Sequence, residues 1–241
     1  MPPYFCAMRI YRQHLLSGAG AARDTAVIID VFRAFTCSAM LLSYGVECLL
    51  LEEDPDKALE LKKRRGCIAL GEIGGVKVKG FDLGNSPSEI AAAGREYFLG
   101  RTVVQRTSAG VRGIFAAIKS CKQVFAAAYT TARAAAVALK RINPEEVHLV
   151  AMGESGTVAV PEDDECAAYI HHLLDPDQPY DHLNSLAKIL SHESARKFLR
   201  GDKAHYPPAD VTWCLQSDIL ERAMEAVLTD RGIELRPVGF S

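Results

Sequence analysis

The sequence predicts a three-layer α/β/α protein, in which helices cover both faces of a largely parallel or mixed central sheet. Short runs rich in β-branched and other apolar residues alternate with segments whose apolar residues recur at helical spacing. Such alternation is typical of parallel strands joined by crossover helices. The chain has 241 residues, of which 49% are hydrophobic and 24% charged, and this is enough to bury one large core.

The predicted elements follow one another in a regular order. TAVIID (25–30) is a strand that ends in a charge, and RAFTCSAMLLSYG after it has helical spacing and a terminal glycine. VECLLL (46–51) and PDKALELKKRRG repeat this pattern, and CIALGE (67–72) is another buried strand. The remaining pairs are strands at 102–105, 123–128 and 146–153, followed by helices at 109–120, 131–142 and about 163–174.

The character of the chain changes after residue 174. A polar loop, DPDQPYDHLN, is followed by the helical segment SLAKILSHESARKFLRG and then by a pre-proline break in HYPPADVTWCLQSD. There is no internal repeat and no linker long enough to separate two domains. We therefore expect a single domain over residues 1–241, with residues 175–210 forming a lid or subdomain.

Composition and charge exclude several classes of protein. The formal net charge of -2 shows no bias toward nucleic acid, and no apolar run is long enough to cross a membrane. The N-terminus lacks the apolar segment of a signal peptide, so we expect a cytoplasmic location. The seven cysteines contain no CxxC pair, which argues for reduced thiols and against a disulfide framework or a thiolate zinc site.

Polar residues follow several predicted strands at the edge where ligands of α/β sheets usually bind. Asp30, Glu72, Glu162 and Asp163 supply the oxygen ligands that Mg²⁺ prefers. Arg33, Arg112 and the backbone amides of residues 108–111, which include Ser108 and Gly110, suit a phosphate group. The sequence therefore predicts metal-assisted phosphoryl chemistry at this edge.

The segment GFDLGNSPSE (80–89) predicts a binding turn that leads into a helix. Ser86 can cap the helix, Pro87 suits its first position, and Glu89 lies at capping-box distance. The flanking glycines allow the turn to bring Asp82 and Asn85 close to a ligand at the helix start.

Each of these groups also has a purely structural explanation. Asp30 can cap the following helix, and Glu162 with Asp163 can complement a helix dipole. Arg106 and Arg112 can be solvated surface side chains. The prediction of a site depends on whether the groups converge in space.

Five ordered blocks of the chain resemble the 2-phosphosulfolactate phosphatases. The blocks are IIDVFRAFT, LGEIGGVKVKGFDLGNSPSE, TVVQRTSAGVRG, PEDDECAA and DVTWCLQSD, and together they run from about residue 25 to 217. The resemblance implies a Mg²⁺-dependent phosphoric monoester hydrolase that converts (R)-2-phospho-3-sulfolactate to 3-sulfolactate and phosphate. It also implies the sulfolactate branch of coenzyme M biosynthesis, an α/β fold and a homo-oligomer, which we expect to be a dimer.

Matching the motif positions gives each residue an expected role. The expected roles are catalytic for Asp30, Arg33 and Asp82; substrate-binding for Asn85, Ser86, Ser108, Gly110 and Arg112; and metal-binding for Asp30, Glu72, Glu162 and Asp163. The order of roles among the carboxylates stays open. The chain departs from the family pattern at Phe35, Arg106, Ala109 and Val111, which bears on the substrate more than on the phosphatase chemistry.

Two alternatives remain beside this interpretation. One is a phosphatase for another small phosphorylated hydroxy acid. The other is a non-catalytic protein that binds anions, although clustered carboxylates serve little purpose in an anion binder that lacks a metal.

Overall fold

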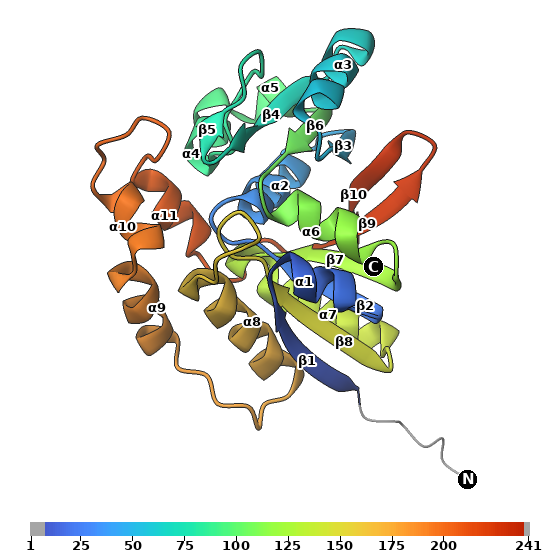
Figure 1. Cartoon of the computed structure of the whole chain (residues 1–241), viewed down its shortest axis with the longest axis vertical. Coiled ribbons are helices and arrows are strands. Elements are labelled where there is room, and N and C mark those ends of the chain that lie inside the picture. The colour runs from blue at the N-terminus through green and yellow to red at the C-terminus, as the bar shows by residue number, and fades with distance from the viewer. Residues whose placement is uncertain (1–7, 239–241) are drawn as a thin grey trace.

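The computed structural model describes residues 8–238 and contains, within that range, one ten-stranded sheet with helices packed around it (Figure 1). The strands are β1 (Arg9–His14), β2 (Asp24–Ile29), β3 (Cys48–Leu51), β4 (Ile68–Ile73), β5 (Val76–Lys77), β6 (Thr102–Arg106), β7 (Cys121–Ala127), β8 (Glu146–Ala151), β9 (Ala223–Thr229) and β10 (Gly232–Val238). The helices are α1 (Leu15–Ala21), α2 (Ala34–Ser43), α3 (Pro55–Arg65), α4 (Pro87–Ala93), α5 (Arg95–Phe98), α6 (Gly110–Ala117), the 3₁₀ turn η1 (Tyr129–Thr131), α7 (Ala132–Ile142), α8 (Pro161–Leu174), α9 (His182–Ser191), α10 (Glu193–Leu199) and α11 (Ala209–Cys214).

The α/β fold class predicted from the sequence is confirmed. The predicted strands at 25–30, 102–105 and 123–128 correspond to β2, β6 and β7, with small shifts at their ends. Helix α8 begins at Pro161, two residues before the prediction, because proline has no N–H to leave unpaired at a first helical position.

Strand β2 shows how the sequence builds the middle layer. Successive side chains of a strand point to opposite faces, yet Ala26, Val27, Ile28 and Ile29 are all fully buried. Helices α1 and α6 pack together near this strand, and α8 packs on β2, β8 and α7. Both faces of the sheet are therefore covered, which explains the unbroken apolar run in the sequence.

The sheet is mixed, with strand order β1-β8-β2-β7-β9-β10-β3-β6-β4-β5. Strands β1, β8, β2 and β7 are parallel to one another, as are β3, β6 and β4. The hairpin β9–β10 lies between these two sets and pairs antiparallel with both β7 and β3. The two parallel sets consequently run in opposite directions, a feature that the strand–helix alternation does not predict.

Two further expectations are resolved by the structure. The cysteines within residues 8–238 are free thiols, and all except Cys121 are buried; Cys6 lies outside the described residues. In that same range, the helices are too short or too polar to cross a lipid bilayer.

Candidate active site

The ends of β2 and β4, the residues just before α6 and the first turn of α8 surround one pocket. The predicted site residues that line it are Asp30, Arg33, Glu72, Asn85, Ser108, Glu162 and Asp163. Strands β2 and β4 belong to the two oppositely directed sets of the sheet, and yet their carboxyl ends meet here. These seven predicted residues therefore converge in space. They do not lie along one edge of a single parallel sheet, which is the arrangement expected from the sequence.

Asp30 is fixed at the base of the pocket by two backbone amides. Its Oδ1 accepts a hydrogen bond from the amide of Ala34 at 3.1 Å, and its Oδ2 accepts one from Gly110 at 2.8 Å. Burial raises the pKa of Asp30 to about 6, with a further contribution from the charge of Glu72, while the two amides and Arg33 act in the opposite direction. Asp30 thus connects the end of β2 to the starts of α2 and α6. Its ionised form is destabilised by burial.

Glu162 and Asp163 enter the pocket from the first turn of α8, and both are buried. Asp163 accepts hydrogen bonds from the amides of Val31 and Gly153, each at 2.8 Å, and Glu162 accepts one from Ser194 Oγ at 2.6 Å. Burial raises the pKa of Glu162 to about 7 and also raises that of Asp163, and the charge of Asp30 adds to both shifts. These carboxylates repel one another in a poorly solvated space.

Glu72 accepts a hydrogen bond from one of the backbone amides that the sequence suggests for a phosphate, that of Ser108. Its Oε1 accepts a hydrogen bond from the amide of Ser108 at 2.6 Å, and its Oε2 accepts bonds from Gly75 N at 2.6 Å and Ser108 Oγ at 3.1 Å. The Gly110 amide donates a hydrogen bond to Asp30, and the Val111 amide donates one to Thr107 Oγ1 at 3.1 Å. The start of α6 therefore holds the protein's own carboxylates.

Arg33 is a buried cation whose position depends on distant parts of the chain. Its Nη1 donates to Asp210 Oδ2 at 2.8 Å and to the carbonyl of His205 at 3.0 Å, and its Nη2 donates to the carbonyl of Gly75 at 3.3 Å. The Phe32–Arg33 peptide bond is cis. Asp210 lies in the DVTWCLQSD block, and no feature of the sequence singles it out.

Four predicted site residues do not line the pocket, although all are described by the structure: Asp82, Ser86, Gly110 and Arg112. Asp82 accepts hydrogen bonds from Lys62 Nζ at 2.6 Å and from the amide of Ala69 at 2.9 Å, so it ties its turn to α3 and β4. Ser86 caps α4, as predicted, and also donates to Asp210 at 2.8 Å. Gly110 acts through its amide on Asp30.

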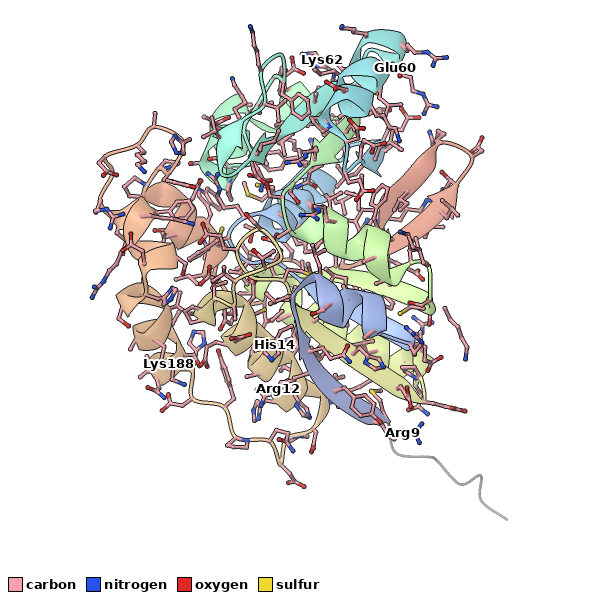
Figure 2. All side chains as sticks on the ribbon, viewed as in Figure 1. Arg9, Arg12, His14, Glu60, Lys62 and Lys188 are labelled. Carbon is pink, nitrogen blue, oxygen red and sulfur yellow. The ribbon has the colours of Figure 1, made fainter. Side chains whose placement is uncertain are left out.

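The run of acids at the start of α8 divides between two directions. Glu162 and Asp163 face the pocket, whereas the next two residues pair with groups elsewhere on the surface. Asp164 pairs with His14 at 3.0 Å and Glu165 with Lys188 at 2.9 Å; Figure 2 labels both basic partners. Helical geometry explains this division, because consecutive residues point about 100° apart.

The sequence reasoning missed the contribution of α10 and the loop after it. Ser194, Lys197, Phe198 and Tyr206 all line the pocket. They belong to residues 175–210, for which the sequence predicts a lid or subdomain, and the Tyr206 hydroxyl donates to the carbonyl of Gly74 at 3.2 Å. No motif marks these residues, because they reach the site only through the packing of α10.

The donor set of the pocket fits a hard divalent cation. Within residues 8–238, no three His, Cys, Asp or Glu side chains stand close enough to form a metal site by themselves. Mg²⁺ usually binds one or two carboxylates and completes its coordination with waters and substrate phosphate, so such a cluster is not required. The mutual repulsion of Asp30, Glu162 and Asp163 is the kind of charge excess that a bound cation offsets.

Of the four departures from the family pattern, Ala109 lines the pocket and the other three do not. Phe35 and Val111 are fully buried in the core. Arg106 donates to the backbone carbonyls of Glu53, at 3.1 Å, and Glu72, so it supports the site wall. Of these four departures, Ala109 is therefore the one that changes the pocket surface.

Comparison with known proteins points to one family. The family model described as 2-phosphosulpholactate phosphatase matches residues 11–227. A protein of Nostoc punctiforme named "Probable 2-phosphosulfolactate phosphatase" is 30% identical over 241 aligned positions, which cover 89% of this chain and 94% of the relative. Proteins with the same name from Bacillus subtilis and Thermus thermophilus are 29% and 37% identical over 85% and 55% of the chain. The Thermus match spans about half the length of that relative, 54%.

Proposed function

Because this chain belongs to the 2-phosphosulfolactate phosphatase family, we propose that it hydrolyses (R)-2-phospho-3-sulfolactate to 3-sulfolactate and phosphate with Mg²⁺. The observation that supports this most directly is the set of buried carboxylates, Asp30, Glu72, Glu162 and Asp163, around a single pocket that also holds Arg33. The substrate carries three anionic groups, so it is attracted to a pocket of this charge only when a cation is bound with it.

The proposed metal ligands are Asp30 and Asp163, with Glu72 and Glu162 on either side. Both carboxyl groups of the first pair are fixed by backbone amides, and each carboxylate oxygen keeps a lone pair beyond the hydrogen bond it accepts. When bound there, Mg²⁺ would polarise a phosphoryl oxygen and offset the charge that develops on it.

Arg33 is suited to bind the phosphoryl group. A guanidinium has five N–H groups, and three of those of Arg33 go to Asp210, His205 and Gly75. The two others are available for a substrate in the pocket that Arg33 lines. Because its partners hold the group rigidly, Arg33 would stabilise charge in the transition state without reorganising.

The experiment is to measure phosphate release from racemic 2-phospho-3-sulfolactate with Mg²⁺ and with a chelator. We expect release that requires Mg²⁺ and exceeds release from 2-phospholactate, which lacks the sulfonate. Equal turnover of both esters would indicate the broader class of phosphorylated hydroxy acids. Tight binding without release would indicate a non-catalytic anion binder.

The proposal also places the chain in the sulfolactate branch of coenzyme M biosynthesis and predicts a homodimer. Light scattering after size-exclusion chromatography measures the second point. A mass near 26 kDa would contradict the dimer, since the chain itself has that mass.

A further inference from the structure

Lys197 is a cation of the pocket to which no role has yet been assigned. It lies in α10, one turn after Ser194, whose hydroxyl donates to Glu162. Of the described residues that line the pocket, Lys197 and Arg33 are the two cationic ones. The Lys197 side chain is 20% exposed, whereas that of Arg33 is 4% exposed and paired within the protein.

The two cations lie against the same pair of aromatic rings. The guanidinium carbon of Arg33 is 5.2 Å from the centroid of the Phe198 ring and 5.7 Å from that of Tyr206. The ammonium nitrogen of Lys197 is 5.9 Å and 5.1 Å from the same centroids. Phe198 and Tyr206 thus form an aromatic wall that holds both positive charges at the pocket.

Lys197 has a partner that it can release. Its ammonium group is 2.7 Å from Glu154, whose side chain is 53% exposed. A pair of this exposure contributes little stability, because water solvates both ions when they separate. Lys197 can therefore exchange the Glu154 carboxylate for an anionic group of a ligand in the pocket at little cost in free energy.

We propose that Lys197 binds the sulfonate of the substrate, the anionic group remote from the phosphate ester. This inference rests on the proposed function, in which the three carbons of the substrate bear, in order, a carboxyl group, a phosphate ester and a sulfonate. Arg33, with Mg²⁺ when it is bound, would act on the phosphoryl group, and Lys197 supplies a second positive charge beside the same two rings. Lys197 would in this way set specificity for the sulfonated ester.

The test compares two esters in wild type and in Lys197→Met, which keeps a similar side-chain length and removes the charge. For 2-phospho-3-sulfolactate we expect KM to rise roughly 10- to 100-fold with a small change in kcat, as loss of one charged hydrogen bond predicts. For 2-phospholactate we expect kcat/KM of Lys197→Met within about twofold of wild type, because this ester lacks the sulfonate that Lys197 binds. Lys197→Arg is expected to restore most of the affinity.

Glu154→Gln is the matched control, because it breaks the same ion pair from the other side. We expect it to lower KM for the sulfonated ester, since Lys197 loses a competing partner. If Glu154→Gln instead raises KM as Lys197→Met does, Lys197 serves only to hold the Glu154 loop, and the inference is overturned. An equal rise in KM for both esters in Lys197→Met would also overturn it.

Calorimetric titration with the product 3-sulfolactate separates this inference from the proposed function. If wild type hydrolyses neither ester, the proposed function fails, and weaker binding of 3-sulfolactate by Lys197→Met than by wild type still supports the sulfonate role. Equal binding by the two folded proteins, judged by their circular dichroism, overturns that role.

Discussion

Arg33 Nη1 and Asp210 Oδ2 are 2.8 Å apart, although 177 positions separate these residues in the chain. Their side chains are 4% and 1% exposed, so this is a buried ion pair. The other oxygen of Asp210 accepts hydrogen bonds from Ser86 Oγ at 2.8 Å and from the amide of Ser88 at 2.9 Å. One carboxylate therefore connects the start of α2, the start of α4 and helix α11.

Replacing Asp210 by Asn should destabilise the protein and impair the site together. Arg33 would be left as an uncompensated buried charge, a change that costs about 3 kcal/mol of unfolding free energy. Urea denaturation measures this loss. Glu60→Gln is the control, because Glu60 pairs with Arg64 at an exposed position, and we expect a change of less than about 0.5 kcal/mol. Similar losses in both variants would contradict the importance assigned to the Arg33–Asp210 pair.

Asp30 and Asp82 offer a matched test of the pocket assignment. Both were predicted to be catalytic, but Asp30 lines the pocket and Asp82 pairs with Lys62 outside it. We expect Asp30→Asn to lower kcat for phosphate release by about 10³-fold, and Asp82→Asn to leave it within about threefold, since electrostatic groups at the reacting centre dominate catalysis. A loss in Asp82→Asn as large as that in Asp30→Asn would show that the reaction uses a different surface.

Gly110→Ala tests how closely α6 approaches Asp30. An added Cβ would lie 2.9 Å from Asp30 Oδ2 and 3.0 Å from the side chains of Ala34 and Phe35. We expect a shifted Asp30 and a fall in kcat/KM of about 100-fold, as for a misplacement of about 1 Å. Gly20→Ala is the control: nothing lies within 4 Å of its Cβ, so helix propensity should raise the unfolding free energy by about 0.5–1 kcal/mol. Activity of Gly110→Ala equal to wild type would contradict the role of this amide.

The buried carboxylates predict a dependence of stability on pH in the metal-free protein. Folding raises the pKa of Asp30 to about 6 and that of Glu162 to about 7. The folded state therefore binds more protons than the unfolded state between about pH 4 and 7, so stability falls as pH rises through this range. With a chelator present, we expect Tm to be lower at pH 8 than at pH 5.

Added Mg²⁺ should reverse that loss. We expect it to raise Tm more at pH 8, where the carboxylates are ionised, than at pH 5. Differential scanning fluorimetry measures both shifts, and Asp30→Asn should reduce the difference between them. An equal effect of Mg²⁺ at the two pH values would count against a metal at these carboxylates.

The sequence predicted the strands of the central layer because their signal is local. Runs such as residues 26–29 are apolar on both faces, and Ser86 with Pro87 marks a helix start by side-chain chemistry alone. The insertion of the hairpin β9–β10 between β7 and β3 was not predicted, because it depends on pairing with strands about 100 or more positions away. Local patterns carry no information about such partners.

The contrast between local and long-range information also explains which site residues could be predicted. Asp30 and Glu72 were found because each follows or ends a buried strand, where a charge requires a partner. Lys197 and Asp210 were not found, since a lysine or an aspartate in a helix resembles any solvated residue until its neighbours are known. Asp82 was included because of its motif, and the structure shows that the turn directs it toward Lys62 and the backbone of β4.

The position of the β9–β10 hairpin also sets the order in which the protein can be completed during synthesis. Strands β7 and β3 have no neighbour on their facing edges until residues 223–238 have left the ribosome and inserted between them. Within residues 8–238, this late segment joins the two parallel sets of strands in the sheet; Asp30 follows a strand of one set, and Glu72 lies in a strand of the other. The nascent chain therefore carries the segments that supply Asp30 and Glu72 before translation delivers the hairpin that joins their strands within the sheet.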